Sequence, residues 1–88
     1  MKSLLSEEVQ IQLLLGTLPY DQKLDLVRTG YVESWVQELL YTDRSWMVRF
    51  FIARHPQTAD HILQQLRCDV HPSVAQYAEM NLKRRHVA

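Results

Sequence analysis

Residues 43–69 read DRSWMVRFFIARHPQTADHILQQLRCD, and this stretch decides how the chain folds. It holds an apolar run from about Ser45 to Arg54, a break at Pro56, and a second apolar segment at about Ala59 to Leu66. The first run is apolar nearly all round, which is typical of a helix that neighbours cover on several sides. A buried strand is the competing interpretation of so short a run. We prefer a helix, because no other segment reads as a strand that could pair with it.

Helical rather than strand periodicity also marks four other segments: about Ser6–Leu15, Pro19 to the residue before Gly30, about Val32–Leu40, and Pro72 to the basic C-terminal end. In residues 32–40 the apolar side chains recur on one helical face, so Gln37 is expected to face water. Helices this short are unstable alone, and short connections make neighbours roughly antiparallel. The sequence therefore predicts an all-α chain of about six short helices stacked as antiparallel pairs.

The composition is that of one globular domain. The chain has 88 residues, of which 47% are hydrophobic and 23% are charged, and this balance argues against disorder. The start of the chain has no secretory apolar segment, and the most apolar stretch, residues 46–53, is far shorter than the roughly 20 residues of a membrane span. The only cysteine, Cys68, excludes an internal disulfide. We therefore expect a cytoplasmic protein that does not enter the membrane.

The chain also repeats itself weakly at an interval of about 26 residues. This shift places Asp43 on Asp69 and Val48 on Val74. The order of the parts supports the repeat, because an acidic residue precedes an apolar helix, a break and a second apolar helix before the next acid. Internal repetition of this kind is typical of stacked helical units.

The sequence VRFFIARHP at Val48–Pro56 resembles the Val-Arg-x-x-Val-Ala-x-x-Pro core of the leucine-rich repeat variant family, a helical relative of HEAT-like repeats. Ile52 stands for the second valine of that core. Five later residues continue the match in register: Thr58, Ile62, Leu63, Leu66 and Asp69. The resemblance implies a right-handed helical solenoid that is used for binding, and it does not indicate a specific activity. The family's iron–sulfur example relies on a cysteine cluster, which this chain lacks, so no cofactor is expected.

On this resemblance we divide the chain, a single helical-repeat domain over residues 1–88, into three parts. Residues 1–42 are expected to form N-terminal capping helices, and residues 43–68 form the best-matching repeat. Residues 69–88 depart from the pattern, since the arginine, alanine and proline of the core are all replaced, and they are expected to form a divergent C-terminal capping repeat.

A structural ladder is the role that the resemblance implies for Asp43, Arg49 and Asp69. In HEAT-like repeats an acid caps one helix and pairs with an arginine, and Asp43 and Arg49 stand six residues apart astride a helix start. Which of the two acids pairs with Arg49 is left open. An Arg49 that contacts a ligand is the less favoured alternative.

The formal net charge of zero hides a division between the two halves of the chain. Residues 1–43 hold three basic and seven acidic residues, a net charge of −4, and residues 44–88 hold seven basic and three acidic residues, a net charge of +4. Opposite halves favour a homodimer, by isologous pairing of acidic with basic halves or by a swap of terminal helices. They also favour a nucleic-acid-binding HEAT-like module that uses the basic C-terminal half as the second function to consider.

The first function to consider is a non-catalytic protein-binding module, a small adaptor or inhibitor that presents a helical-repeat face to a larger protein partner. Aromatic and arginine side chains are enriched at binding hot spots. The predicted partner-binding residues are Arg44, Trp46, Arg54, Arg67 and Tyr77. Trp46, at a helix start, is a surface candidate, whereas Trp35 lies on an apolar stripe and is expected in the core.

No catalytic or metal site is predicted. The chain has no Gly-x-Ser-x-Gly, His-Glu-x-x-His or Gly-rich phosphate motif, and thin helical layers leave little room for a dry pocket, so we do not expect an enzyme. Cys68 and His71 stand at a metal-ligand spacing, but zinc needs four convergent ligands and no second pair is present. The Cys68 thiol is expected to be partly buried near the end of the fifth helix.

Overall fold

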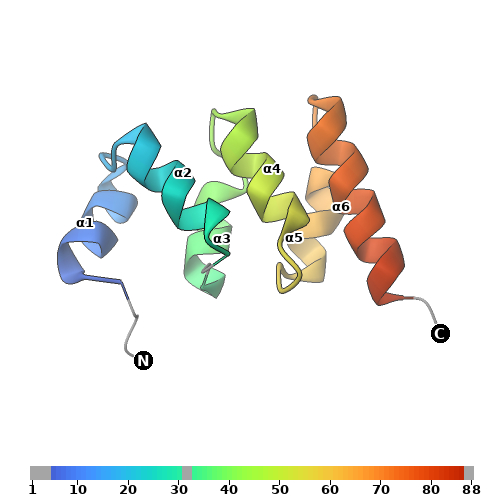
Figure 1. Ribbon diagram of the computed structural model, residues 1–88, viewed down its shortest axis with the longest axis horizontal. Coiled ribbons are helices and arrows are strands. Elements are labelled where there is room, and N and C mark those ends of the chain that lie inside the picture. Colours follow the sequence, from blue (N-terminus) through green and yellow to red (C-terminus); the bar gives the residue numbers. More distant parts are fainter. Residues whose placement is uncertain (1–4, 31–32, 87–88) are drawn as a thin grey trace.

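The computed structural model describes residues 5–30 and 33–86, and within these ranges it contains six α-helices and no strand (Figure 1). The helices are α1 (Glu7–Leu15), α2 (Tyr20–Arg28), α3 (Ser34–Leu40), α4 (Trp46–Arg54), α5 (Asp60–Leu66) and α6 (Pro72–Arg85). The prediction of an all-α chain of about six short helices is thus confirmed for these residues. Val32, the first apolar residue of the third predicted segment, lies outside them.

Local signals set the helix ends. The hydroxyl of Ser6 accepts a hydrogen bond from a backbone amide in the first turn of α1, and Gly16 ends that helix in the left-handed conformation, with φ of 74°. The Ser45 hydroxyl caps α4 in the same way. Helix α4 ends at Arg54 because the next residue, His55, precedes Pro56 and takes extended backbone angles.

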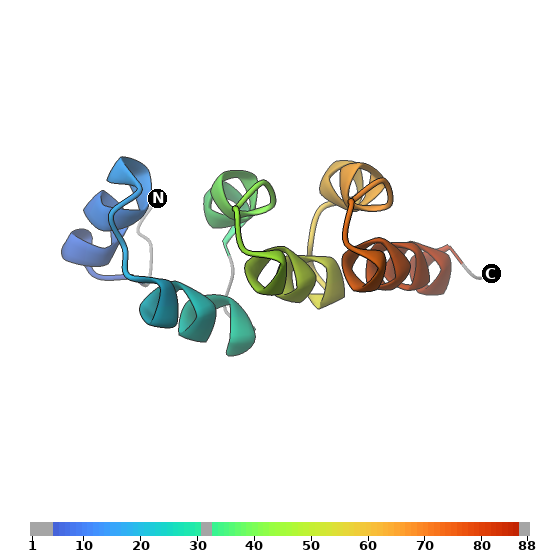
Figure 2. The same cartoon turned by 90° about the horizontal axis from the view of Figure 1, so that it is seen from above.

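The helices alternate between two layers. Seen from above, α1, α3 and α5 lie in one row and α2, α4 and α6 lie in the other (Figure 2). The rows follow the long axis of a molecule that measures 40 × 28 × 18 Å, with α1 at one end and α6 at the other (Figure 1). Helix α4 packs against α2, α3, α5 and α6. This position explains why its sequence is apolar nearly all round.

The hydrophobic core lies between the two layers. Its fully buried members come mainly from the last three helices: Val48, Ile52 and Ala53 of α4, Ile62, Leu63 and Leu66 of α5, and Val74, Ala78 and Leu82 of α6. Burial of one such aliphatic side chain stabilises the fold by about 1.5–3 kcal/mol. Trp35 is half-buried and packs against this core, as its place on an apolar stripe predicts.

The apolar stripe predicts that Gln37 faces water. This prediction is wrong, because the Gln37 side chain is buried. Helix α5 begins after Ala59, which has no side chain that can cap it. Gln37 of α3 instead binds the cap residue itself, with its Oε1 accepting a hydrogen bond from the Ala59 amide at 3.0 Å. Its Nε2 donates to the Gln57 carbonyl at 3.4 Å. The requirement for partners at a helix terminus therefore outweighs the cost of burying an amide.

Side chains of α6 also form hydrogen bonds with the connection between α4 and α5. The Asn81 side chain, which is 2% exposed, donates from Nδ2 to the carbonyls of Ala53 and His55 at 2.9 and 2.8 Å. Arg85 donates from Nη2 to the carbonyl of Pro56 at 2.6 Å. These bonds satisfy carbonyls at the C-terminal end of α4 that have no partner within the helix.

We predict that Asn81→Ala lowers the free energy of unfolding by about 1–3 kcal/mol, because the Ala53 carbonyl loses its donor and the His55 carbonyl keeps only the longer bonds, each 3.3 Å, from Thr58 and Arg85. Each kcal/mol corresponds to a fall of about 4–8 °C in Tm for a domain of this size. Thermal unfolding followed by circular dichroism measures the change. The control is Gln76→Ala, at an exposed site on the same helix, which should shift stability by no more than about 0.5 kcal/mol. Equal melting of the two variants would contradict the prediction.

Candidate partner-binding surface

Two ion pairs each join a helix of the layer that holds α2, α4 and α6 to the connection that follows a helix of the other layer. Nζ of Lys23 in α2 lies 2.7 Å from Oδ2 of Asp43, and Nε of Arg49 in α4 lies 2.7 Å from Oδ2 of Asp69. The two cations stand 26 residues apart in the sequence, and so do the two acids. The contacts between helices therefore recur at the interval of the sequence repeat.

Arg49 contacts both predicted ladder acids, but in different ways. It forms a bidentate pair with the carboxylate of Asp69, whose second contact, Nη2 to Oδ1, is 3.1 Å long. It reaches Asp43 only through the backbone, with Nη1 donating to the carbonyl at 2.6 Å. The Asp43 carboxylate pairs instead with Lys23, a residue that the sequence reasoning did not single out. Lys23 stands 26 residues before Arg49, which is the interval of the repeat, and this spacing is the sequence signal that could have identified it.

The pair of Arg49 and Asp69 is largely withdrawn from water, with side chains 13% and 8% exposed. Burial by itself raises the pKa of Asp69. Hydrogen bonds from the Arg49 guanidinium and from the His71 amide lower it by more, so the pKa lies below its ordinary value of 3.8. This carboxylate is therefore ionised over the whole neutral range.

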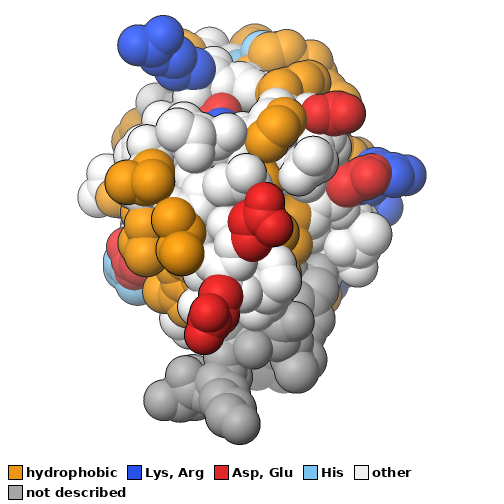
Figure 3. All heavy atoms as spheres, turned by 90° about the vertical axis from the view of Figure 1, so that its left-hand side faces the viewer, with side chains coloured by type: hydrophobic (Ala, Val, Ile, Leu, Met, Phe, Trp, Pro, Cys, Tyr) orange, Lys and Arg blue, Asp and Glu red, His pale blue; other side chains and the backbone are white. Residues whose placement is uncertain are grey.

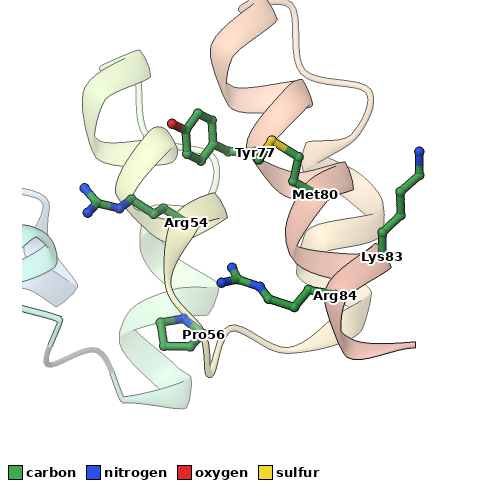
Figure 4. A pocket seen from close by; sticks show the side chains of 6 residues that line it. All are labelled: Arg54, Pro56, Tyr77, Met80, Lys83 and Arg84. Carbon is green, nitrogen blue, oxygen red and sulfur yellow. The ribbon is translucent and has the colours of Figure 1, made fainter. Parts of the chain in front are cut away.

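A groove of about 810 Å³ opens between α4 and α6 (Figure 4). Its lining residues are Arg54, Pro56, Tyr77, Met80, Lys83 and Arg84. Tyr77 and Arg84 extend from α6 toward α4, and Lys83 points away from α4 (Figure 4). The lining thus combines three cations with an aromatic ring, a thioether and a proline, and it includes no acid.

A row of rings adjoins this groove. The indole of Trp46 stacks on the imidazole of His71 with centroids 3.9 Å apart and planes 6° apart. The Phe50 ring lies edge-on to Trp46 at 6.2 Å and to Tyr77 at 4.8 Å. Trp46 and Tyr77 remain 39% and 37% exposed. Since Tyr77 belongs to both the row and the groove, the two form one continuous surface, which we call the α4–α6 face.

Three of the five predicted partner-binding residues lie on the α4–α6 face. Arg54 and Tyr77 line the groove, and Trp46 joins it through the row of rings. Arg44 and Arg67 are exposed but line no part of this groove. Arg44 lies in the connection before α4, and Arg67 follows α5, where it donates to Gln64 Oε1 at 3.0 Å.

The sequence reasoning missed Met80 and Pro56 as members of this surface. Tyr77, Met80 and Arg84 stand at positions i, i+3 and i+7 of α6, which is a single helical face. This spacing is the signal that could have found Met80. Pro56 has no such signal, because only the packing of α6 beside the α4–α5 connection brings it to the groove.

The surroundings of Cys68 and His71, the two residues at a metal-ligand spacing, differ from those of a metal site. His71 caps α6, with Nδ1 accepting a hydrogen bond from the Ser73 amide at 3.2 Å, and its ring is stacked on Trp46. Cys68 is exposed, which corrects the expected partial burial, because α5 ends at Leu66 and the thiol lies in the connection to α6. Among residues 5–30 and 33–86, no three His, Cys, Asp or Glu side chains are grouped so that they could hold a metal ion.

The longest helix in the described part of the chain, α6, has 14 residues, and none there has both the length and the apolar character that crossing a membrane requires. Comparison with protein-family models, with curated proteins and with solved structures finds no match for this chain. The resemblance to the leucine-rich repeat variant thus stays a prediction that residues 43–69 carry. Function has to be argued from the α4–α6 face.

We predict that Arg49→Ala lowers the free energy of unfolding by about 3 kcal/mol, because it leaves the buried Asp69 carboxylate without its cation. A double-mutant cycle with Asp69→Ala should show a coupling of about 1–3 kcal/mol. The matching cycle with Asp43→Ala is the control and should show a smaller one, since Arg49 contacts only the backbone there. If Arg49→Ala melts like the wild type and loses partner binding, Arg49 belongs to the binding surface.

The depressed pKa of Asp69 also predicts a pH dependence. A carboxyl whose pKa is lower in the folded state stabilises the fold above its unfolded pKa and loses this contribution as the pH falls through the folded pKa. The Tm difference between wild type and Asp69→Asn should therefore be complete above pH 3.8 and shrink below it. Asp21→Asn, at an exposed site of α2, is the control for the removal of one carboxylate away from this ion pair. A Tm difference that is constant from neutral to acid pH would contradict the assignment.

Proposed function

We propose that this chain is a non-catalytic protein-binding module, a small cytoplasmic adaptor or inhibitor. In this proposal the helices form a short right-handed solenoid of antiparallel pairs, and the α4–α6 face binds a larger protein partner. The supporting observation is the groove between α4 and α6, where three cations stand beside an exposed tyrosine and methionine with no acid among the lining residues.

The chemistry of the groove suits a protein segment that carries both apolar and acidic side chains. Tyrosine and arginine are enriched at binding hot spots, and methionine adapts its shape to the side chain that it meets. A stable protein interface buries about 800 Å² on each partner, which is more than one groove of this size offers. The contact would therefore extend along the row of rings to Trp46, whose exposed indole lies at the far end of the α4–α6 face.

The second candidate is a nucleic-acid-binding module, which the groove cations Arg54, Lys83 and Arg84 favour. Single-stranded nucleic acids gain much of their affinity from bases that stack on free aromatic faces. One face of Trp46 is already covered by His71, and Tyr77 is packed against Phe50. These contacts already occupy one ring face of Trp46 and part of the Tyr77 ring, where a base would have to stack, so we rank protein binding first.

The test compares capture by three immobilised proteins: wild type, Tyr77→Ala and the control Arg67→Ala, whose side chain is exposed outside the groove. A protein captured by wild type from the native lysate should bind the purified control equally well. It should bind Tyr77→Ala at least about tenfold more weakly, which corresponds to 1.4 kcal/mol. Equal affinity for Tyr77→Ala would contradict the groove as the binding site.

The same variants separate the two candidates. If phosphates are the target, binding of a mixed-sequence oligonucleotide must weaken steeply with salt, and Arg54→Ala or Arg84→Ala should each lower the log–log slope by about one. Fluorescence anisotropy at increasing salt measures this slope. Absence of binding at low salt would remove the nucleic-acid candidate.

A further inference from the structure

The outer face of α1 is apolar and uncovered. Ile11, Leu14 and Leu15 are 55%, 66% and 71% exposed and stand at positions i, i+3 and i+4, which is one helical face. Glu7 and Glu8 are exposed in the first turn of the same helix, which contains no basic residue. Figure 3 looks at this end of the molecule and shows apolar side chains beside acidic ones, with Lys and Arg mainly at the upper left and right of the view.

The other side of α1 packs normally within the fold. Leu13 is buried, Val9 packs against the core, and the helix contacts α3. Apolar residues therefore lie on both sides of α1, and a helix of this kind is normally covered on both sides. Among residues 5–30 and 33–86, only one of these two sides is covered by the rest of the chain.

The groove between α4 and α6 complements this face in both respects. It offers apolar contact through Tyr77 and Met80, of which Met80 is 51% exposed. Its cations Arg54 and Arg84 are opposite in charge to the two acids of α1, whereas Lys83 points away from α4 and lies 3.6 Å from Glu79 (Figure 4). Helix α1 lies at one end of the long axis, whereas the groove lies between α4, near the middle, and α6, at the other end (Figure 1). Helix α1 cannot reach the groove of its own chain, so the groove that it fits belongs to a second copy.

We propose that α1 of one copy docks into the α4–α6 groove of another copy. Ile11, Leu14 and Leu15 provide the apolar anchors at the spacing by which an amphipathic helix enters a groove. Glu7 and Glu8 meet the groove cations, of which Arg84 extends toward α4 (Figure 4). Two observations support this contact: the opposite charges of the two surfaces, and their exposed apolar side chains, which no other part of the described chain covers.

The proposed contact is head-to-tail: α1 of one copy fills the groove of the next, without the reciprocal second contact that would close an isologous dimer. It therefore differs from the dimers that the charge division of the sequence suggests. Each added copy leaves one free α1 at one end of the assembly and one free groove at the other. Growth beyond two copies with rising concentration follows from this geometry. The inference uses the groove of the proposed function but requires no foreign partner.

The experiment uses one variant to block each surface. Leu14→Asp places a charge in the α1 face, and Met80→Glu places one in the groove, both at sites that are more than half exposed and therefore compatible with folding. Val70→Asp, at a site 93% exposed outside both surfaces, is the matched control. Circular dichroism verifies that all three variants fold, and sedimentation velocity at low salt measures their association.

Wild type and Val70→Asp should associate beyond a dimer as concentration rises, and each blocked variant should associate at least about tenfold more weakly. An equimolar mixture of the two blocked variants should form a one-to-one dimer that does not grow, since only one intact α1 and one intact groove can meet. A monomeric wild type, a wild type that stops at a closed dimer, or a mixture that stays monomeric would each overturn the proposal.

The two blocked variants also separate this inference from the proposed function. Leu14→Asp keeps its groove and should bind a foreign partner at least as well as wild type, whereas Met80→Glu should lose both activities. If the wild type self-associates but binds no foreign partner, only this inference is supported. Partner binding by a strictly monomeric protein would support only the proposed function.

Discussion

Unsatisfied backbone groups at the end of α4 are the constraint on which the arrangement of the other helices depends. A helix leaves its last carbonyls without partners, and Pro56 prevents the chain from continuing the helix. Side chains from elsewhere supply the missing donors, among them Asn81 and Arg85 of α6. Gln37 of α3 serves the start of the next helix. These bonds hold α6 beside α4, and the groove exists because of that placement.

The recurring ion pairs extend the same principle along the molecule. Lys23 pairs with Asp43 and Arg49 with Asp69, and each acid also accepts a hydrogen bond from the amide two residues later, at 2.9 Å in both cases. The position one interval after Arg49 is Ala75, which has no charge to continue the series. Helix α6 therefore has no ladder cation, and its outer residues are available for a different purpose, which we infer to be binding.

Local features of the sequence predicted the helices well because they act within a few residues. The Ser45 cap, the break at Pro56 and the apolar run between them required no knowledge of the rest of the chain. The contacts of Gln37 could not be predicted in this way, since its partners stand about 20 residues later and come close only through packing. The same reason explains the site: Tyr77 and Arg54 were predicted by residue type, whereas Pro56 joins the groove only in three dimensions.

The positions of the helices determine which charges of the acidic and basic halves of the chain can attract each other. The acids of α1 lie at one end of the long axis and the groove cations lie on α4 and α6, away from that end, so we infer that attraction between them acts between molecules rather than within one. A partner that fills the groove and a second copy that offers α1 would then compete for one surface. By mass action, a partner that binds the groove tightly would displace α1 and dissociate the assembly. Conversely, a high concentration of the chain would lower its apparent affinity for the partner. Under the two proposals, the free concentration of this protein therefore regulates its own binding.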